Sequence, residues 1–507
     1  MASTGGRRGV RRAAAIAAAA VAYLACAGSA PAGAARTGDV STPSPFGVNG
    51  GVLWPDGGNL LSSSRHTAAI ARSGLRSVRV IPFWNLVEPE PPNPRTGAHR
   101  FVWTRTDAIA DNLARNDLRW DALLGFSTPW GGVFPGTTAG PPKVKPFSEY
   151  AAAIAGRYGR GGDFWKANPH LPYVPIINYQ VWNEPNLTAS LTGMEPEPYA
   201  NLYAATRTAI LAVDPHARVA VGGLVHSSPA PGNGNASPFL ERMFAARPDL
   251  AGHVDAVGLT IYRQSPAQVM TQVAGARRVL DALGERSTPI DIDETGWATR
   301  GGVMLTDIAP VSEPTRAAFL TQLVGLLAAS DCGLGVVSPF AWVTAEDNPG
   351  DASAWYGLAD RQSANLKPSG AAYVAAAGAA TDPGPPAAGA QTCGRPDLPR
   401  LLQRRAPALA AFKVTLSRRC SARRLIVRYT LGPGPEPFQR LTLTLPGSSR
   451  PRVVEDPDAG GPRTARTSLQ VRLPRKPGTV TVVAHDELGR AQATGTARLA
   501  ACRARRR

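Results

Sequence analysis

Two short segments of the chain each place a glutamate at the end of an expected strand. Glu184 follows residues 179–183, and Pro185 then denies a backbone donor where a strand must stop. Glu294 follows residues 289–293 in the same way, 110 residues further along. Either glutamate alone would most often be an ordinary solvated residue. A matched pair at two strand ends predicts two carboxyl groups that act together.

The elements around these glutamates determine where their side chains point. From about Pro45 to Gly378, short apolar runs alternate with stretches of helical periodicity, which is typical of βα units and a parallel sheet. The helix-like stretches include Phe147–Tyr158, Pro198–Val213, Pro266–Leu283 and Glu313–Ala329. The eight expected strands are Phe46–Gly50, Ser77–Ile81, Trp120–Phe126, Ile176–Trp182, Val219–Leu224, Ala256–Ile261, Ile290–Asp293 and Gly335–Phe340.

Eight strand-helix repeats predict a (β/α)₈ TIM barrel of the α/β class, whose active site is built at the C-terminal ends of the strands. Glu184 ends the fourth expected strand and Glu294 the seventh. Both carboxyl groups are therefore expected at the mouth of one barrel.

Two carboxyl groups in different protonation states are what the cleavage of a glycosidic bond requires. One group donates a proton to the leaving oxygen, and the other, ionised, attacks or stabilises the anomeric carbon. Retaining enzymes hold the two groups about 5 to 5.5 Å apart, whereas inverting enzymes need roughly 6.5 to 9.5 Å. The pair Glu184 and Glu294 therefore predicts a glycosidase.

The segment Val181-Trp-Asn-Glu-Pro-Asn186 resembles the acid/base motif of glycoside hydrolase clan A, the retaining barrel enzymes that include cellulases, mannanases and β-xylosidases. The resemblance covers roughly residues 45–378, and within the clan this region is similar to the cellulase-like family 5 or the β-xylosidase-like family 39. In that clan the acid/base follows an asparagine at the end of the fourth strand, and the nucleophile ends the seventh. The resemblance thus implies Glu184 as general acid/base and Glu294 as nucleophile.

The same resemblance implies roles for four further residues. Asn183 would bind the sugar 2-hydroxyl, and Arg79 would keep the nucleophile ionised. Tyr262 would orient the nucleophile, and Trp342 would form the aromatic floor beneath a sugar ring. Three of them have a structural alternative: a strand-end cap for Asn183, an ion pair for Arg79, and core packing for Tyr262.

Other residues near the expected strand ends have no single predicted role in the site. Glu88 is interpreted either as structural or as a residue that supports those in contact with the substrate. The chain also departs from the clan, because Thr260 stands where many members have histidine and the third strand ends at Phe126 without the histidine of some cellulases. These departures leave the substrate open. Four tryptophans either line further subsites or pack the barrel, namely Trp84, Trp130, Trp297 and Trp355.

The formal charge of +18 is distributed very unevenly along the chain. Residues 1–36 contribute +5, residues 37–390 contribute −4, and residues 391–507 contribute +17. The expected barrel is therefore mildly acidic, and the basic character belongs to the C-terminal part. That part lacks aromatic residues clustered among its basic ones, which argues against a nucleic-acid-binding function. We expect it instead to contact an anionic cell-wall or extracellular polymer, with a merely solvated basic surface as the alternative.

Four segments are expected along the chain. Residues 1–35 combine a basic start, an apolar run and small residues, which predicts a cleaved signal peptide and a secreted or cell-envelope protein. The barrel domain would span residues 37–378. Residues 379–398 are rich in Pro, Ala and Gly and form a linker. Short alternating runs between Gly and Pro turns predict a small all-β, sandwich-like domain over residues 399–507.

Four cysteines remain after the signal peptide, and they allow three pairings in an oxidising compartment. Cys332 with Cys393 and Cys420 with Cys502 are favoured, while free buried cysteines remain the alternative. No stretch after the N-terminus is apolar over 18 residues, so no membrane span is expected. No metal-ligand cluster or phosphate-binding loop is found in the sequence, so no cofactor is expected.

The sequence thus predicts a secreted retaining glycosidase that hydrolyses O-glycosyl bonds of a β-linked oligo- or polysaccharide. Two other functions are compatible with the same residues. A catalytically inactive, carbohydrate-binding envelope protein would share the barrel, although the retained carboxyl pair argues against it. A transglycosylase would differ only in the acceptor.

Overall fold

The computed structural model describes the chain in twelve stretches, which form two compact units. One unit lies within residues 45–164 and 176–394, and the other within residues 165–175 and 412–502. The described stretches are 45–51, 64–187, 192–226, 235–302, 308–380, 393–394, 412–431, 440–448, 452–454, 466–474, 476–485 and 491–502.

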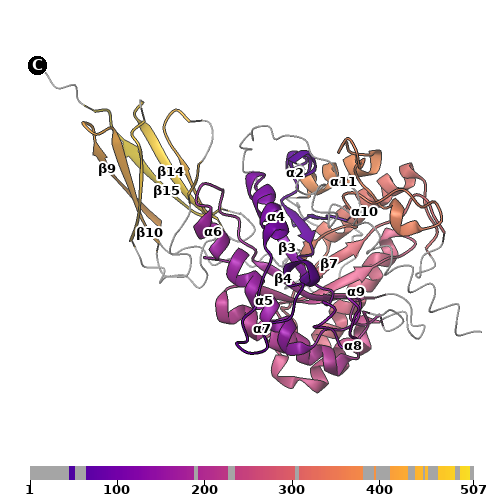
Figure 1. Cartoon of the computed structure of the whole chain (residues 1–507). Coiled ribbons are helices and arrows are strands. Elements are labelled where there is room, and N and C mark those ends of the chain that lie inside the picture. The colour runs from indigo at the N-terminus through magenta and orange to yellow at the C-terminus, as the bar shows by residue number, and fades with distance from the viewer. Residues whose placement is uncertain are drawn as a thin grey trace, which may run out of the picture. The chain divides into compact units, whose positions relative to one another are not determined.

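The first unit is a (β/α)₈ barrel (Figure 1). Its eight strands pair in parallel in sequence order, and backbone hydrogen bonds from Gly47 N to Val337 O and from Val337 N to Pro45 O join the last strand to the first. All eight expected strands are confirmed. They are β1 Val48–Asn49, β2 Ser77–Val80, β3 Arg119–Leu124, β4 Asn178–Asn183, β5 Arg218–Val225, β6 Ala256–Ile261, β7 Ile290–Thr295 and β8 Leu334–Val337.

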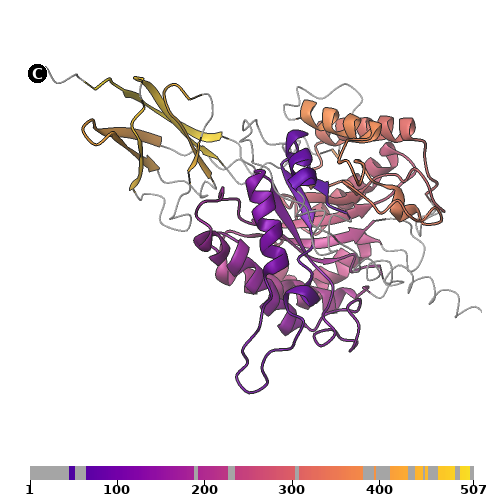
Figure 2. The same ribbon diagram turned by 45° about the horizontal axis from the view of Figure 1, so that its top comes forward.

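Helices cover the outside of this sheet (Figures 1 and 2). Their starts follow local chemistry: Ser265 accepts a hydrogen bond from Gln268 N, Ser312 accepts one from Thr315 N, and proline occupies the first turn of both helices. The helical segments are α2 Ser64–Arg72, α3 Trp84–Val87, α4 Thr104–Arg115, α5 Val144–Tyr158, α6 Asp163–Ala167, α7 Pro196–Val213, α8 Ala236–Ala246, η1 Pro248–Leu250, α9 Pro266–Ala282, α10 Glu313–Ala329, η2 Ala352–Trp355 and α11 Pro368–Ala379.

A buried ion pair joins three strands of the barrel. Arg218 on β5 donates to both carboxylate oxygens of Asp291 on β7, at 2.7 and 2.8 Å, and to Asn178 Oδ1 on β4 at 2.6 Å. Asp291 also accepts from Val336 N. Because a buried charge is tolerated when it is paired and hydrogen-bonded, this network can lie among apolar strands.

The second unit contains two antiparallel sheets, in the orders β13-β10-β9 and β12-β11-β14-β15. Their inward side chains form one apolar core that includes Leu425, Val427, Tyr429, Val480 and Val482. The expected small all-β, sandwich-like domain is confirmed. The strands are β9 Phe412–Arg419, β10 Arg424–Leu431, β11 Arg440–Thr444, β12 Arg452–Val454, β13 Arg466–Arg472, β14 Gly478–His485 and β15 Ala491–Leu499.

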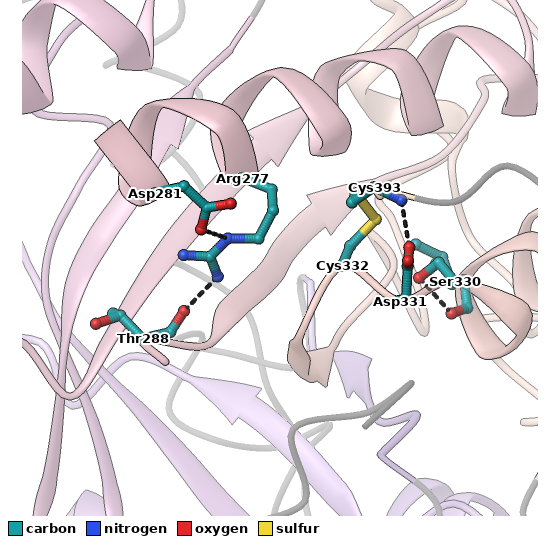
Figure 3. The surroundings of a disulfide bond; sticks show 8 residues. Arg277, Asp281, Thr288, Ser330, Asp331, Cys332 and Cys393 are labelled. Carbon is teal, nitrogen blue, oxygen red and sulfur yellow. Dashed lines mark hydrogen bonds and ion pairs between the residues drawn. A yellow bond between two sulfur atoms is a disulfide. The ribbon is translucent and has the colours of Figure 1, made fainter. Parts of the chain in front are cut away.

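Two disulfides confirm the favoured cysteine pairing. Cys420 bonds to Cys502 across the start and end of the second unit, and Cys332 bonds to Cys393 just before β8 (Figure 3). Cys393 N also donates to Asp331 Oδ1. The Cys332–Cys393 disulfide holds residues 393–394, which follow the barrel in the sequence, against the turn that leads into β8.

Other sequence predictions fall outside the described residues. The expected signal peptide lies there entirely, and so does most of the expected linker, so the four segment boundaries remain predictions. Among the described residues, no helix combines the length and the apolar character needed to span a membrane.

Candidate active site

Glu294 is held at the end of β7 by two hydrogen-bond donors. Arg79 Nη1 donates to Glu294 Oε1 at 2.9 Å, and the Tyr262 hydroxyl donates to Oε2 at 2.9 Å. The Glu294 side chain keeps 13% of its surface exposed, whereas that of Arg79 keeps 5%. Each carboxylate oxygen thus has a fixed partner, and the ionised form is the one that accepts both bonds.

Arg79 connects three strands at this end of the barrel. Besides Glu294 on β7, it contacts two residues of β4: Nη2 donates to Asn183 Oδ1 at 3.0 Å, and Nε donates to Gln180 Oε1 at 2.8 Å. The structure therefore brings Arg79, Asn183, Tyr262 and Glu294 together. Gln180 is not among the site residues predicted from the sequence. A polar residue within a mostly apolar expected strand was the signal that could have indicated it.

Glu184 lies immediately after β4 and has a different environment. Among the described residues no hydrogen bond reaches its carboxyl group. Burial, followed by the nearby negative charge of Glu294, raises the pKa of Glu184 to about 8, and Arg79 offsets part of this rise. Glu184 is accordingly protonated at neutral pH.

The backbone that presents Glu184 is in an uncommon conformation. Trp182 and Glu184 have φ angles of 69° and 48°, in the left-handed region that non-glycine residues rarely adopt. The Tyr199 hydroxyl, from α7, supports this strand end by donating to Val181 O at 2.8 Å and accepting from Gly222 N at 2.6 Å. Trp182 Nε1 donates to Thr192 O at 2.9 Å. Packing and hydrogen bonds thus hold the turn that positions the carboxyl group.

Asp293, directly before Glu294, has a buried carboxyl group that the sequence analysis did not single out. A β-carbon on Gly258 would lie 1.8 Å from Asp293 Oδ2, so the glycine leaves the space that this carboxyl fills. Oδ2 has no hydrogen-bond partner among the described residues. Burial raises the pKa of Asp293 to about 8, which places a neutral carboxyl group beneath the site at neutral pH.

The predicted role of Trp342 as a sugar platform is not supported, because its ring is fully buried. Its Nε1 donates to His66 Nδ1 and its backbone N to Asn49 O, so the residue turns inward toward β1 and α2. Strand β8 ends at Val337, earlier than expected. Phe340 is the partly exposed aromatic residue near this strand end, with its ring 5.7 Å from that of Tyr356.

The remaining aromatic candidates divide into two groups. Trp84 and Trp297 are buried and pack the barrel, whereas Trp130 and Trp355 are partly exposed. Glu88 is fully buried and accepts from Trp84 Nε1 at 2.9 Å, in keeping with a structural role.

The two departures from the clan pattern are both part of the barrel's packing. The Thr260 hydroxyl is buried and donates to Gly223 O at 3.4 Å. The Phe126 ring stacks on Phe83 at 5.3 Å, with Phe126 at a φ of 62°. Among the described residues, neither side chain forms a hydrogen bond with Glu184 or Glu294.

One cluster of residues contains side chains of the types that bind metals, but two of them are already joined in a disulfide. Asp331, Cys332 and Cys393 offer ligand atoms within 4.8 Å of one another. The two cysteines are bonded to each other, and a disulfide supplies no thiolate for a metal.

No protein-family model and no curated protein matches this sequence. Solved structures do resemble the fold. A glucosidase from Croceicoccus marinus aligns with a TM-score of 0.49 at 12% identity, over 86% of this chain and 95% of its own. A GH39 β-xylosidase from Caulobacter crescentus aligns with a TM-score of 0.46 at 18% identity, over 80% and 83%. An endo-β-1,4-mannanase from Thermotoga petrophila aligns with a TM-score of 0.42 at 13% identity, over 90% and 97%.

Proposed function

We propose that this protein is a retaining glycoside hydrolase of the clan A type, with Glu184 as general acid/base and Glu294 as nucleophile. The observation that carries the proposal is the unequal environment of the two carboxyl groups. Glu294 accepts two hydrogen bonds suited to an ionised carboxylate, while burial raises the pKa of Glu184 to about 8. Glycosidic cleavage requires this division into one ionised and one protonated group.

In the first step, Glu184 gives its proton to the leaving glycosidic oxygen while a Glu294 oxygen attacks the anomeric carbon. The glycosidic bond breaks and a covalent glycosyl-enzyme ester forms. Glu184, now ionised, then takes a proton from water as the water attacks the same carbon. The Glu294 ester bond breaks, and the sugar is released with its original anomeric configuration.

The residues around the pair would support both steps. Arg79 and Tyr262 hold the nucleophile in place, so that attack needs little reorganisation. Asn183, whose Oδ1 is fixed by Arg79, would present its amide to the sugar 2-hydroxyl. Phe340 would replace Trp342 as the aromatic surface for a sugar ring.

The proposed substrate is a β-linked oligo- or polysaccharide, outside the cell or at its envelope. The two disulfides are compatible with an oxidising compartment. The N-terminal segment is proposed as a cleaved signal peptide, and the basic C-terminal unit is proposed to hold the enzyme on an anionic polymer.

The experiment is a hydrolysis screen of the purified chain against aryl β-glycosides and β-linked polysaccharides. Proton NMR follows the anomeric configuration of the first product. Hydrolysis with retention supports the proposal, and an inverted product contradicts the assigned mechanism. Absence of hydrolysis across the panel, together with binding to one of its glycans, would favour the inactive carbohydrate-binding protein.

A further inference from the structure

The outer face of the three-stranded sheet in the second unit carries a row of arginines in register. On β10, Leu425, Val427 and Tyr429 point into the core, so Arg424 and Arg428 lie on the opposite, exposed face. Arg424 is paired directly with Arg419 on β9 and with Arg472 on β13. Three exposed arginines thus form one cross-strand row.

The rest of this face adds positive charge, and its described residues include no acidic side chain. Exposed Lys413 and Arg428 extend it along the strands, and Gln470 lies beside the row. The described residues of 412–502 include twelve Lys or Arg and no Asp or Glu. The positive charge is therefore not neutralised by carboxylates within the described part of this unit.

Such a row is unfavourable in the isolated protein. Like charges placed directly opposite each other on neighbouring strands destabilise a sheet. Neighbouring strands lie about 4.8 Å apart, so the three guanidinium groups start from Cα atoms spread over roughly 10 Å. A ligand with regularly spaced anionic groups would offset this repulsion.

We propose that this face, defined by Lys413, Arg419, Arg424, Arg428 and Arg472, binds a linear anionic polysaccharide that carries a carboxylate on each sugar. Guanidinium groups bind carboxylates through paired hydrogen bonds, and a strand spacing of about 5 Å is comparable to one sugar unit. The exposed side chains of this face include no aromatic ring among the described residues. The face therefore lacks the stacking platforms that neutral sugars and single-stranded nucleic acids use.

This inference rests on the proposed role of the C-terminal unit in holding the enzyme on an anionic polymer. It does not depend on the proposed hydrolysis, because the ligand is bound by a face of the other unit. The experiment uses the full-length chain and soluble polygalacturonate, with titrations monitored calorimetrically at several NaCl concentrations. The test variant is Arg419→Gln/Arg424→Gln/Arg472→Gln. The matched control, Lys145→Gln/Lys476→Gln/Arg498→Gln, removes the same number of exposed charges elsewhere.

We expect the natural chain to bind polygalacturonate in a salt-sensitive way, because ions are released when charged groups pair. The test variant should bind at least about tenfold more weakly at low salt, while the control should bind within about threefold of the natural chain. The test variant should also unfold at an equal or higher temperature, which separates lost binding from misfolding.

Three results would overturn the proposal. The first is absence of salt-sensitive binding by the natural chain, which would leave a merely solvated basic face. The second is equal weakening by the test and control variants, which would indicate a net-charge effect. The third is tighter binding to polyphosphate or to phosphatidylglycerol vesicles than to polygalacturonate, which would assign the face to a different class of partner.

Discussion

The ends of β4 and β7 carry the same residue type in opposite surroundings. At β7, Glu294 accepts hydrogen bonds from Arg79 and Tyr262. At β4, Glu184 receives no hydrogen bond on its carboxyl group from the described residues, and burial raises its pKa. The difference shows how one barrel prepares two glutamates for two roles: hydrogen-bond donors stabilise the charge of Glu294, and burial together with that negative charge keeps Glu184 neutral.

The largest expected effect is the loss of the nucleophile. Glu294→Ala should reduce kcat by at least about 10⁴-fold, because it removes the group that forms the covalent intermediate. Added azide should fit the vacated space and give a glycosyl azide of inverted configuration. Steady-state kinetics and NMR of the product check both points. Unchanged hydrolysis by this variant would refute the assignment of Glu294.

The acid/base should matter less, and its effect should depend on the leaving group. Glu184→Ala should reduce kcat/KM by about 10² to 10⁴-fold for a poor leaving group that needs a proton. A dinitrophenyl glycoside, whose leaving group needs none, should be affected much less in the first step. Rates measured with a series of aryl glycosides test this. A uniform loss across the series would contradict the acid role.

The donors around Glu294 should have a smaller effect. Tyr262→Phe removes one hydrogen bond to a charged group, so kcat should fall by about tenfold. Tyr203→Phe is a matched control, because its hydroxyl bonds to Val219 O instead of a carboxylate. The control should lower thermal stability without lowering kcat. An equal loss of kcat in both variants would indicate a general packing defect.

The smallest expected effect concerns pH and stability. The folded-state pKa of Asp293, about 8, lies above its unfolded value, so protonated Asp293 contributes stability that is complete below that unfolded value and is lost as pH rises toward 8. Asp293→Asn should therefore raise the melting temperature relative to the natural chain at pH 9 more than at pH 4.

The control for this measurement is Asp249→Asn, an exposed carboxyl that pairs with Arg247. Its effect on the melting temperature should not increase toward pH 9, because the Arg247 hydrogen bond lowers the pKa of Asp249. A difference for Asp293→Asn that stays constant across this pH range would contradict the neutral buried carboxyl.

Much of the scaffold could be predicted from the sequence because its signals are local. Apolar runs marked all eight strands, and Pro185 marked the end of β4. Side-chain direction beyond a strand end is set by tertiary packing, so Trp342 could not be recognised as buried against β1 and α2. The partnership of Gln180 with Arg79 likewise depends on two strands 101 residues apart in the sequence.

The central claim is tested most directly by trapping the covalent intermediate. The purified chain would be incubated with dinitrophenyl 2-deoxy-2-fluoro-β-glycosides of the sugars it hydrolyses, and the labelled peptide would be identified by mass spectrometry. The fluorine slows release of the sugar, so the ester should accumulate. We predict one fluorosugar on Glu294 and none in Glu294→Ala. A label on Glu184, or no label with a sugar that the chain turns over, would contradict the account.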